Sequence, residues 1–98
     1  MWVRIAKFDG AEGNWDDRIP EVRERMRSGM SGGDSPPVKR AIMLADRESN
    51  RGANVMFCET EDDLRKVDEF MNNMTIPGGG GTRTSVEMYE VAVDSDAL

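Results

Sequence analysis

Two kinds of hydrophobic pattern alternate along this chain, one typical of strands and one typical of helices. Residues 2–8 alternate roughly between apolar and polar side chains and contain β-branched and aromatic residues, which predicts a strand. Residues 16–30 carry apolar side chains at intervals of three and four, which predicts a helix with one buried face. Either this helix begins after a cap at Asp16 or Asp17, or it begins nearer Trp15 and Pro20 kinks it.

The middle of the chain predicts two strands joined by a hairpin loop. Residues 38–46 form a short run that is apolar on both faces, which is typical of a strand buried on both sides. The polar segment 46–52 ends in glycine and is typical of a hairpin loop. Residues 53–58 are then the return strand.

A second helix and a last strand follow the hairpin. Thr60 is a suitable N-cap, and apolar residues at helical spacing continue from there to Met74. Pro77 and the glycine run at residues 78–81 end this helix. Residues 84–93 predict the last strand, and residues 94–98 predict a frayed tail.

The predicted order of elements is strand, helix, strand, strand, helix, strand. This βαββαβ order is typical of an α+β, ferredoxin-like fold with a four-stranded antiparallel sheet, and it makes residues 1–93 one domain. Right-handed connections place both helices on one face of the sheet. Because the strands are apolar on both faces, the uncovered face would be a large apolar patch. We therefore expect a homodimer that packs through the open sheet face.

Composition narrows the range of functions. The chain has 98 residues, a formal net charge of −6, no histidine and one cysteine. The negative charge argues against nucleic acid as a partner, because domains that bind it normally present a basic face. The absence of histidine removes His-based catalysis and His-ligated zinc or haem, and one cysteine cannot form an intramolecular disulfide. No apolar run is long enough to span a membrane and no signal-peptide pattern is present, so we expect a cytoplasmic protein without a membrane role.

Four segments carry a resemblance to a known family. They are residues 2–10 (WVRIAKFDG), 41–48 (AIMLADRE), 57–65 (FCETEDDLR) and 85–93 (SVEMYEVAV). Together with the order of elements over residues 2–93, they resemble the dimeric α+β barrel superfamily and, more narrowly, small proteins related to antibiotic-biosynthesis monooxygenases. The resemblance implies two chains that pack their sheets into a barrel, with a small-molecule pocket between the sheet and the helices of each chain.

The same resemblance implies more than one activity. Some members of that family oxidise polycyclic phenolic substrates with oxygen and no cofactor, and others degrade haem. This chain has Cys58 where many relatives carry tryptophan, and Asn72 and Asn73 where a histidine often sits. We therefore expect a cofactor-free, monooxygenase-like enzyme acting on a small aromatic or phenolic substrate. The alternative is a non-catalytic homodimer that binds a small ligand or only assembles. We expect no cofactor and no metal in either case.

Three polar residues within the predicted strands are candidate catalytic groups. Asn54 interrupts an apolar strand, where its amide could hydrogen-bond a substrate carbonyl or phenolate, or could instead bond the backbone at a sheet edge. Arg4 and Arg40 have apolar neighbours and carry a permanent charge. Either arginine could stabilise an anionic substrate, point to solvent at a strand end, or pair across the dimer.

Trp15, Met56 and Tyr89 are candidate ligand-binding residues. Trp15 could line an aromatic pocket, Met56 could form an adaptable pocket wall, and the Tyr89 hydroxyl could donate to a ligand. Packing is the commoner use of all three residue types. Cys58 is better interpreted as a small buried hydrophobic residue than as a nucleophile, because no histidine is present to activate it. The glycine run at residues 78–81 lacks the Lys-Ser/Thr of a phosphate loop and precedes a strand, which favours a linker or a pocket lid.

Overall fold

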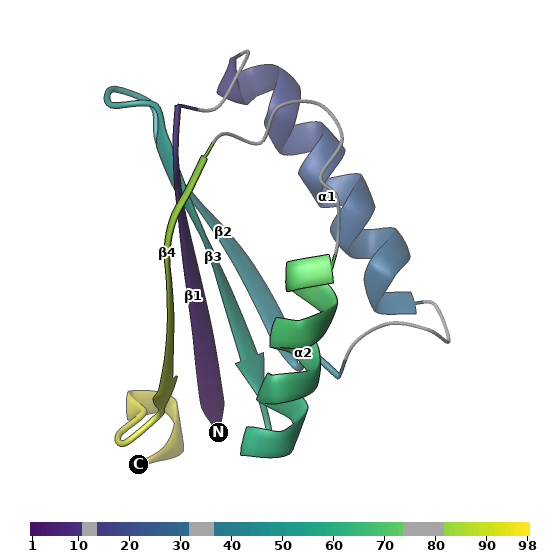
Figure 1. The fold of residues 1–98 in the computed structure, drawn as a ribbon, viewed down its shortest axis with the longest axis vertical. Coiled ribbons are helices and arrows are strands. Elements are labelled where there is room, and N and C mark those ends of the chain that lie inside the picture. Colours follow the sequence, from purple (N-terminus) through teal and green to yellow (C-terminus); the bar gives the residue numbers. More distant parts are fainter. Residues whose placement is uncertain (11–13, 32–36, 74–81) are drawn as a thin grey trace.

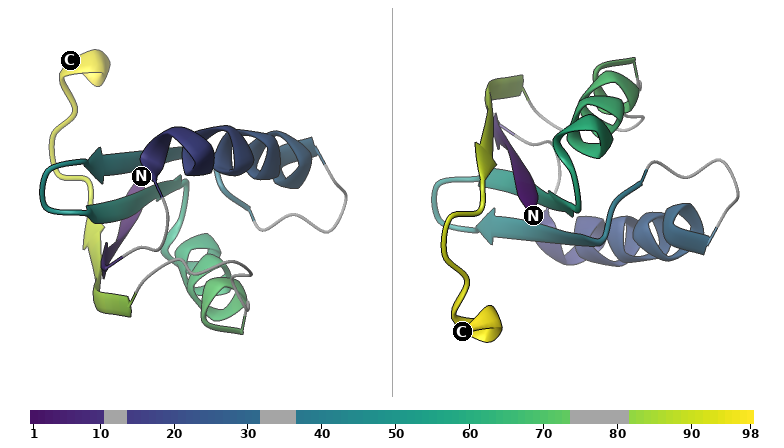
Figure 2. Two further views of the ribbon diagram at one scale, coloured as in Figure 1. Left: turned by 90° about the horizontal axis from the view of Figure 1, so that it is seen from above. Right: turned by 90° about the horizontal axis from the view of Figure 1, so that it is seen from below.

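The predicted α+β fold is present in the computed structural model, which describes residues 1–10, 14–31, 37–73 and 82–98. The strands are β1 (Trp2–Asp9), β2 (Arg40–Asp46), β3 (Arg51–Cys58) and β4 (Thr82–Glu90), and the helices are α1 (Trp15–Ser31) and α2 (Glu61–Asn73). The strands form one antiparallel sheet in the order β2-β3-β1-β4. Both helices cover the same face of this sheet (Figure 1 and Figure 2). The ferredoxin-like prediction is confirmed.

The first helix begins at Trp15, the earlier of the two predicted starts. Its cap is Asn14, whose side-chain Oδ1 accepts hydrogen bonds from the backbone N–H groups of Asp16 at 2.7 Å and Asp17 at 3.3 Å. The two aspartates therefore lie in the first turn, where negative charge interacts favourably with the helix dipole. Pro20 lies inside the helix and cannot donate a backbone hydrogen bond to the preceding turn.

The hairpin loop is shorter than predicted, because β3 begins at Arg51. Asn50 in the loop has a φ of 56°, a left-handed conformation that asparagine tolerates better than most residues. Thr60 is the N-cap of α2, since its Oγ1 accepts a hydrogen bond from the Asp63 N–H at 3.1 Å. β2, which was predicted to be buried on both sides, is an edge strand whose residues are half-buried or exposed in the single chain.

The last strand begins and ends earlier than predicted. β4 ends at Glu90, although the Val91 N–H still donates to the Met1 carbonyl at 2.9 Å. In the predicted tail, η1 (Ser95–Ala97) is a short, exposed 3₁₀ turn, and the Asp94 side chain caps it by accepting a hydrogen bond from the Asp96 N–H at 2.9 Å. The predicted helix end at Pro77 and the glycine run lie outside the described residues.

A small apolar core lies between α2 and the sheet. Its buried members are Cys58, Leu64 and Val67. The half-buried side chains of Trp2, Val38, Met56 and Met71 pack against them. Phe70 belongs to the predicted apolar stripe of α2 but is 44% exposed, so only part of that stripe is buried.

The pairing register assigns each strand residue to one of two faces. Arg4 contacts Asp68 of α2, so Arg4 and its direct cross-strand partners face the helices. This helix-facing side consists of four rows: Trp2, Cys58 and Glu90; then Ala41, Met56, Arg4 and Met88; then Met43, Asn54, Ala6 and Val86; then Ala45, Gly52, Phe8 and Arg83. The open face carries the alternate residues: Arg40, Phe57, Val3 and Tyr89; then Ile42, Val55, Ile5 and Glu87; then Leu44, Ala53, Lys7 and Ser85.

Candidate functional site

A hydrogen-bonded polar cluster joins β1, α2 and β4 on the helix-facing side. Arg4 is only 1% exposed; its Nε donates to Asp68 Oδ1 at 2.9 Å and its Nη2 to Asn72 Oδ1 at 3.5 Å. Arg83 Nη1 donates to the same Asn72 oxygen at 2.7 Å, and Asn72 Nδ2 donates to Asp68 Oδ2 at 3.3 Å. A buried guanidinium is tolerated when it is paired and hydrogen-bonded, so Asp68 and Asn72 explain how the fold accommodates Arg4.

Asn54 lies one row from Arg4 on the same side of the sheet. It pairs with Ala6 of β1 and Met43 of β2, and it is half-buried. Within the described part of the chain its side-chain amide makes no hydrogen bond, so the amide is free to bond water or a ligand. Met56, in the adjacent row, packs against the core. The structure thus places Asn54, Arg4 and Met56 on one side of the sheet.

Trp15 packs onto this side at the start of α1. It is 8% exposed, and its ring lies over Gly52, where an added Cβ would be only 2.7 Å from the Trp15 Cη2 atom. The Arg18 guanidinium carbon lies 5.2 Å from the centroid of the indole ring, a cation–π distance. Among the residues that the structure describes, buried Trp15 Nε1 and Arg18 Nη1 have no hydrogen-bond partner. The main visible role of Trp15 is to pack α1 against β3.

The other two predicted site residues lie on the open face. Arg40 pairs with Phe57, and Tyr89 pairs with Val3, so neither faces the helices. Tyr89 is 51% exposed, and its hydroxyl donates to Glu87 Oε2 at 3.2 Å. The Glu87 carboxylate raises the pKa of the Tyr89 hydroxyl. The structure therefore does not bring Arg40 or Tyr89 together with Asn54, and the roles of all six residues stay predictions.

Cys58 is fully buried at the end of β3. Burial raises the pKa of its thiol, and the nearby Asp63 carboxylate raises it further. A thiol held protonated is a poor nucleophile. These surroundings fit a packed core residue.

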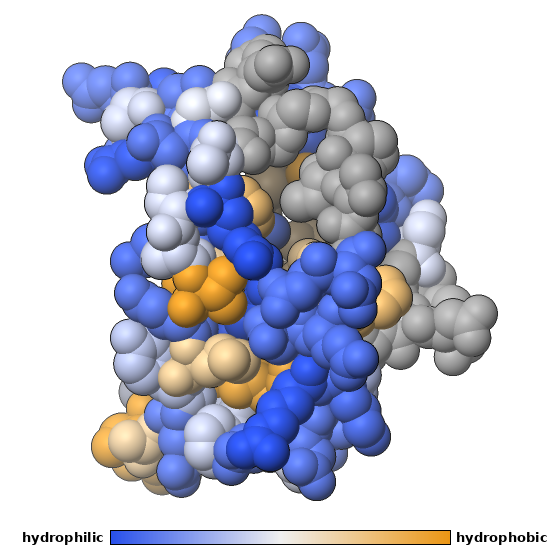
Figure 3. Space-filling view, in the orientation of Figure 1, coloured by the Kyte–Doolittle hydropathy of each residue, from blue (hydrophilic) through white to orange (hydrophobic). Residues whose placement is uncertain are grey.

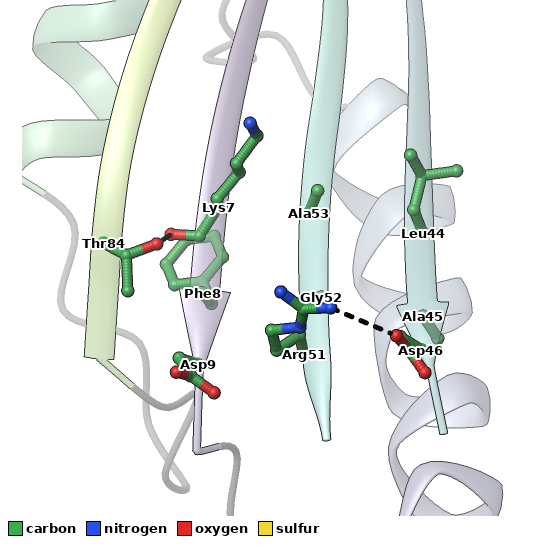
Figure 4. Close-up of a pocket in the computed structure, with 10 residues that line it drawn as sticks. All are labelled: Lys7, Phe8, Asp9, Leu44, Ala45, Asp46, Arg51, Gly52, Ala53 and Thr84. Carbon is green, nitrogen blue, oxygen red and sulfur yellow. Dashed lines mark hydrogen bonds and ion pairs between the residues drawn. The ribbon is translucent and has the colours of Figure 1, made fainter. Parts of the chain in front are cut away.

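A hollow of about 440 Å³ lies near the hairpin end of the sheet (Figure 4). It is lined by Lys7, Phe8, Asp9, Leu44, Ala45, Asp46, Arg51, Gly52, Ala53 and Thr84. Arg51 Nη2 and Asp46 Oδ2 form an ion pair at its hairpin end at 3.5 Å, and hydrogen bonds from Ser49 lower the pKa of the Asp46 carboxyl. Lys7, Leu44 and Ala53 belong to the open face, so this hollow is distinct from the predicted pocket between sheet and helices.

Two findings concern metals and membranes. Among the described residues, no three cysteine or acidic side chains are grouped closely enough to hold a metal ion. In the same part of the chain, no helix has the length and apolar character that a membrane span requires.

Comparison with solved structures gives a relative in fold, whereas comparison with protein sequences gives none. No protein-family model matches the sequence, and no curated protein matches it either. Among solved structures the chain is similar to MhuD, in a crystal structure of a mutant form with two manganese protoporphyrin IX molecules bound per active site. The similarity covers 96% of this chain and 97% of MhuD, with a TM-score of 0.58 and 17% sequence identity. The chain therefore shares the α+β, ferredoxin-like fold of MhuD.

The residues of this chain do not fit a His-ligated haem. The chain contains no histidine, and Cys58, the only thiol, is buried with a raised pKa. Tyr89, the only tyrosine, lies on the open face. The porphyrin bound by MhuD therefore does not by itself define a ligand for this protein.

Two members of the polar cluster, Asp68 and Arg83, are not among the site residues predicted from the sequence. Asp68 belongs to the wet side of a helical pattern, and Arg83 precedes the predicted last strand by one residue. Their contacts with Arg4 and Asn72 join positions far apart in the chain. The signal that could have drawn attention to Asp68 is its spacing from Asn72, because residues four apart share one face of a helix.

Proposed function

We propose that this protein is a homodimeric, monooxygenase-like enzyme that binds a small aromatic or phenolic molecule between its sheet and its helices. One observation carries the proposal. The amide of Asn54 is unbonded in the described structure, and it shares the helix-facing side with the buried cluster around Arg4. The fold shared with MhuD supports a small-molecule role, and the aliphatic and thioether side chains of Met43, Met56 and Val86 suit an aromatic ring.

The proposed reaction needs no bound cofactor. An ionised phenol supplies the electrons that reduce O₂; one oxygen atom becomes a new carbonyl on the substrate and the other leaves as water. Asn54 Nδ2 donates a hydrogen bond to the substrate oxyanion and stabilises the charge that develops there. Removing one such donor typically lowers the rate about 100-fold.

The described residues constrain the substrate. Asp68 is engaged by Arg4, and the Cys58 thiol is held protonated, so neither is well suited to remove a substrate proton. We therefore infer a substrate whose phenol or enol ionises readily without a strong protein base. This also favours the second candidate function, a dimer that binds such a molecule without transforming it.

The catalytic proposal is tested with dithranol, an anthrone that O₂ converts at one methylene to a carbonyl with release of water. We expect the protein to accelerate oxygen uptake above the rate in buffer, and Asn54→Leu to lower that acceleration about 100-fold. The matched control is Asn73→Leu, the same substitution at an exposed residue of α2. If the protein binds dithranol but leaves its oxidation at the buffer rate, the catalytic proposal is wrong and the binding function stands.

The uncovered open face of the sheet is the basis on which we propose a homodimer. Its central row carries Ile42, Val55 and Ile5, with Glu87 at the β4 edge, and neither helix covers it (Figure 2). An apolar surface of this kind in a protein with a dimeric-barrel fold is best covered by the same face of a second copy.

A further inference from the structure

A β-bulge in β4 directs Arg83 toward α2. β1 pairs Lys7 with Ser85 but Phe8 with Arg83, so Thr84 is an extra residue on the β4 side. Without this bulge, strict alternation from Val86 would place Arg83 on the open face. The Thr84 Oγ1 donates to the Lys7 carbonyl at 3.3 Å and holds the bulge to β1. A bulge that re-aims one side chain is a feature typical of functional sites.

The re-aimed Arg83 gives the polar cluster an excess of positive charge. The cluster has two guanidinium groups, Arg4 and Arg83, and one carboxylate, Asp68, which leaves one positive charge. Arg4 is paired with Asp68, but among the described residues no carboxylate forms an ion pair with Arg83. Arg83 is instead held by the neutral Asn72 amide. This excess lies on a chain whose formal net charge is −6.

An apolar surface adjoins this charge on β4. Val86 and Met88 follow Arg83 on the helix-facing side, and Met88 is 46% exposed. Hydrophobic surface gathers between β4 and α2 in the space-filling view, bordered by hydrophilic surface (Figure 3). Within the described ranges, only Nη1 of the Arg83 guanidinium donates a hydrogen bond. A cation with further donors beside an exposed apolar surface matches a molecule with an apolar ring system and one anionic group.

We propose that Arg83 binds an anionic group of the ligand separate from the oxygen at Asn54, and that this group is a carboxylate or a sulfonate on an aromatic body. Asn72 is the positioning residue, because its Oδ1 fixes the Arg83 guanidinium beside Arg4. The aromatic body of the ligand lies over Val86 and Met88. This inference rests on the proposed function, and it adds the charge of the ligand and the residue that selects it.

The test compares two fluorescent dyes that share one ring system. 8-Anilinonaphthalene-1-sulfonate carries a sulfonate, and N-phenyl-1-naphthylamine lacks it. We expect the wild-type protein to bind both, and Arg83→Gln to raise the Kd of the sulfonate dye about tenfold, a typical effect of losing a hydrogen bond to a charged group. The Kd of the neutral dye stays unchanged. Arg83→Lys retains the charge and recovers part of the lost affinity.

The control is Arg65→Gln, which also removes one positive charge. Arg65 lies on α2, is exposed, and pairs with Glu61 at 2.6 Å. The assignment of Arg83 as the anion-binding residue is wrong if Arg65→Gln raises the Kd of the sulfonate dye as much as Arg83→Gln does. It is also wrong if Arg83→Gln raises the Kd of both dyes equally. In either case the proposed binding of a small molecule stands. If the folded wild-type protein binds neither dye, both the anion site and the proposed small-molecule function are wrong.

Discussion

The two faces of the sheet differ in how their polar groups are arranged. On the helix-facing side, Arg4 is buried and bonded to Asp68 and Asn72. On the open face, the centre is the apolar row through Ile42 and Val55, and the charged groups of the hollow stand at its hairpin end. Burying charge is unfavourable unless partners are built around it, whereas an apolar sheet face needs only a complementary apolar surface. From this difference we propose that the first face recognises the ligand and the second face serves assembly.

The largest expected effect is the loss of Arg4. Arg4→Met leaves the Asp68 carboxylate without its cation, and we expect the free energy of unfolding to fall by about 3–5 kcal/mol, measured by urea denaturation. The matched control is Arg47→Met, because Arg47 pairs with Asp16 at 2.7 Å but both side chains are exposed. That substitution should cost less than about 1 kcal/mol. Equal losses of unfolding free energy in the two variants would show that burial does not make the Arg4–Asp68 pair more stabilising than an exposed pair.

The next effect concerns the open face. Val55→Asp places a charge at the centre of the proposed dimer interface, and we expect it to weaken the dimer by about 3 kcal/mol, or more than 100-fold in Kd. Light scattering during gel filtration should then give the mass of one chain, where the wild type gives two. Val93→Asp is the control, because Val93 is 77% exposed in the tail. A wild type that is already a monomer at high concentration would contradict the proposed assembly.

A smaller difference in stability is expected between substitutions at Gly52 and Ala53, which are neighbours on opposite faces of β3. Gly52→Ala adds a Cβ that would meet the Trp15 ring at 2.7 Å and the Leu44 carbonyl oxygen at 3.2 Å, so we expect a loss of about 1–3 kcal/mol and altered tryptophan fluorescence. Ala53→Val adds bulk on the open face, where Ala53 lines the hollow, and should change stability by less than about 0.5 kcal/mol. If Gly52→Ala leaves both stability and fluorescence unchanged, Trp15 does not pack against Gly52 as described.

The smallest expected effect is a pH dependence. Burial raises the pKa of the Cys58 thiol in the folded protein above the ordinary value of 9.0. Folding therefore favours the protonated thiol; this stability is fully present below about pH 9 and is lost as pH rises through the folded pKa. Between pH 7 and pH 10, the wild type should lose more unfolding free energy than Cys58→Ala. Equal losses of unfolding free energy in the two proteins would show that ionisation of the Cys58 thiol does not contribute to the pH dependence of stability.

Much of the fold follows from local patterns, because each element carries its own signal. The helical spacing of Leu64 and Val67, the cap at Thr60 and the alternation in β1 each predict what the structure contains. The start of α1 could not be decided from sequence, because Asn14, Asp16 and Asp17 are all capable caps.

The candidate site was only partly predictable. A strand that is apolar on both faces, such as β2, gives no indication of which face Arg40 occupies. The bulge at Thr84 moves Arg83 to the other face of the sheet, and the pattern of apolar and polar residues in the sequence does not indicate this bulge. Asp68 is specified by a contact with Arg4 that only the folded chain creates.

A methyl NMR titration shows which face of the sheet a ligand occupies, because the two faces carry different methyl-bearing residues. Met43, Met56 and Met88 lie on the helix-facing side, and Ile5, Ile42 and Val55 lie on the open face. With these residue types ¹³C-labelled, we would titrate 8-anilinonaphthalene-1-sulfonate into the protein. We expect the Met56 and Met88 signals to shift while those of Ile42 and Val55 stay in place. Shifts confined to Ile42 and Val55 would contradict this expectation, because the ligand would then occupy the face assigned to assembly.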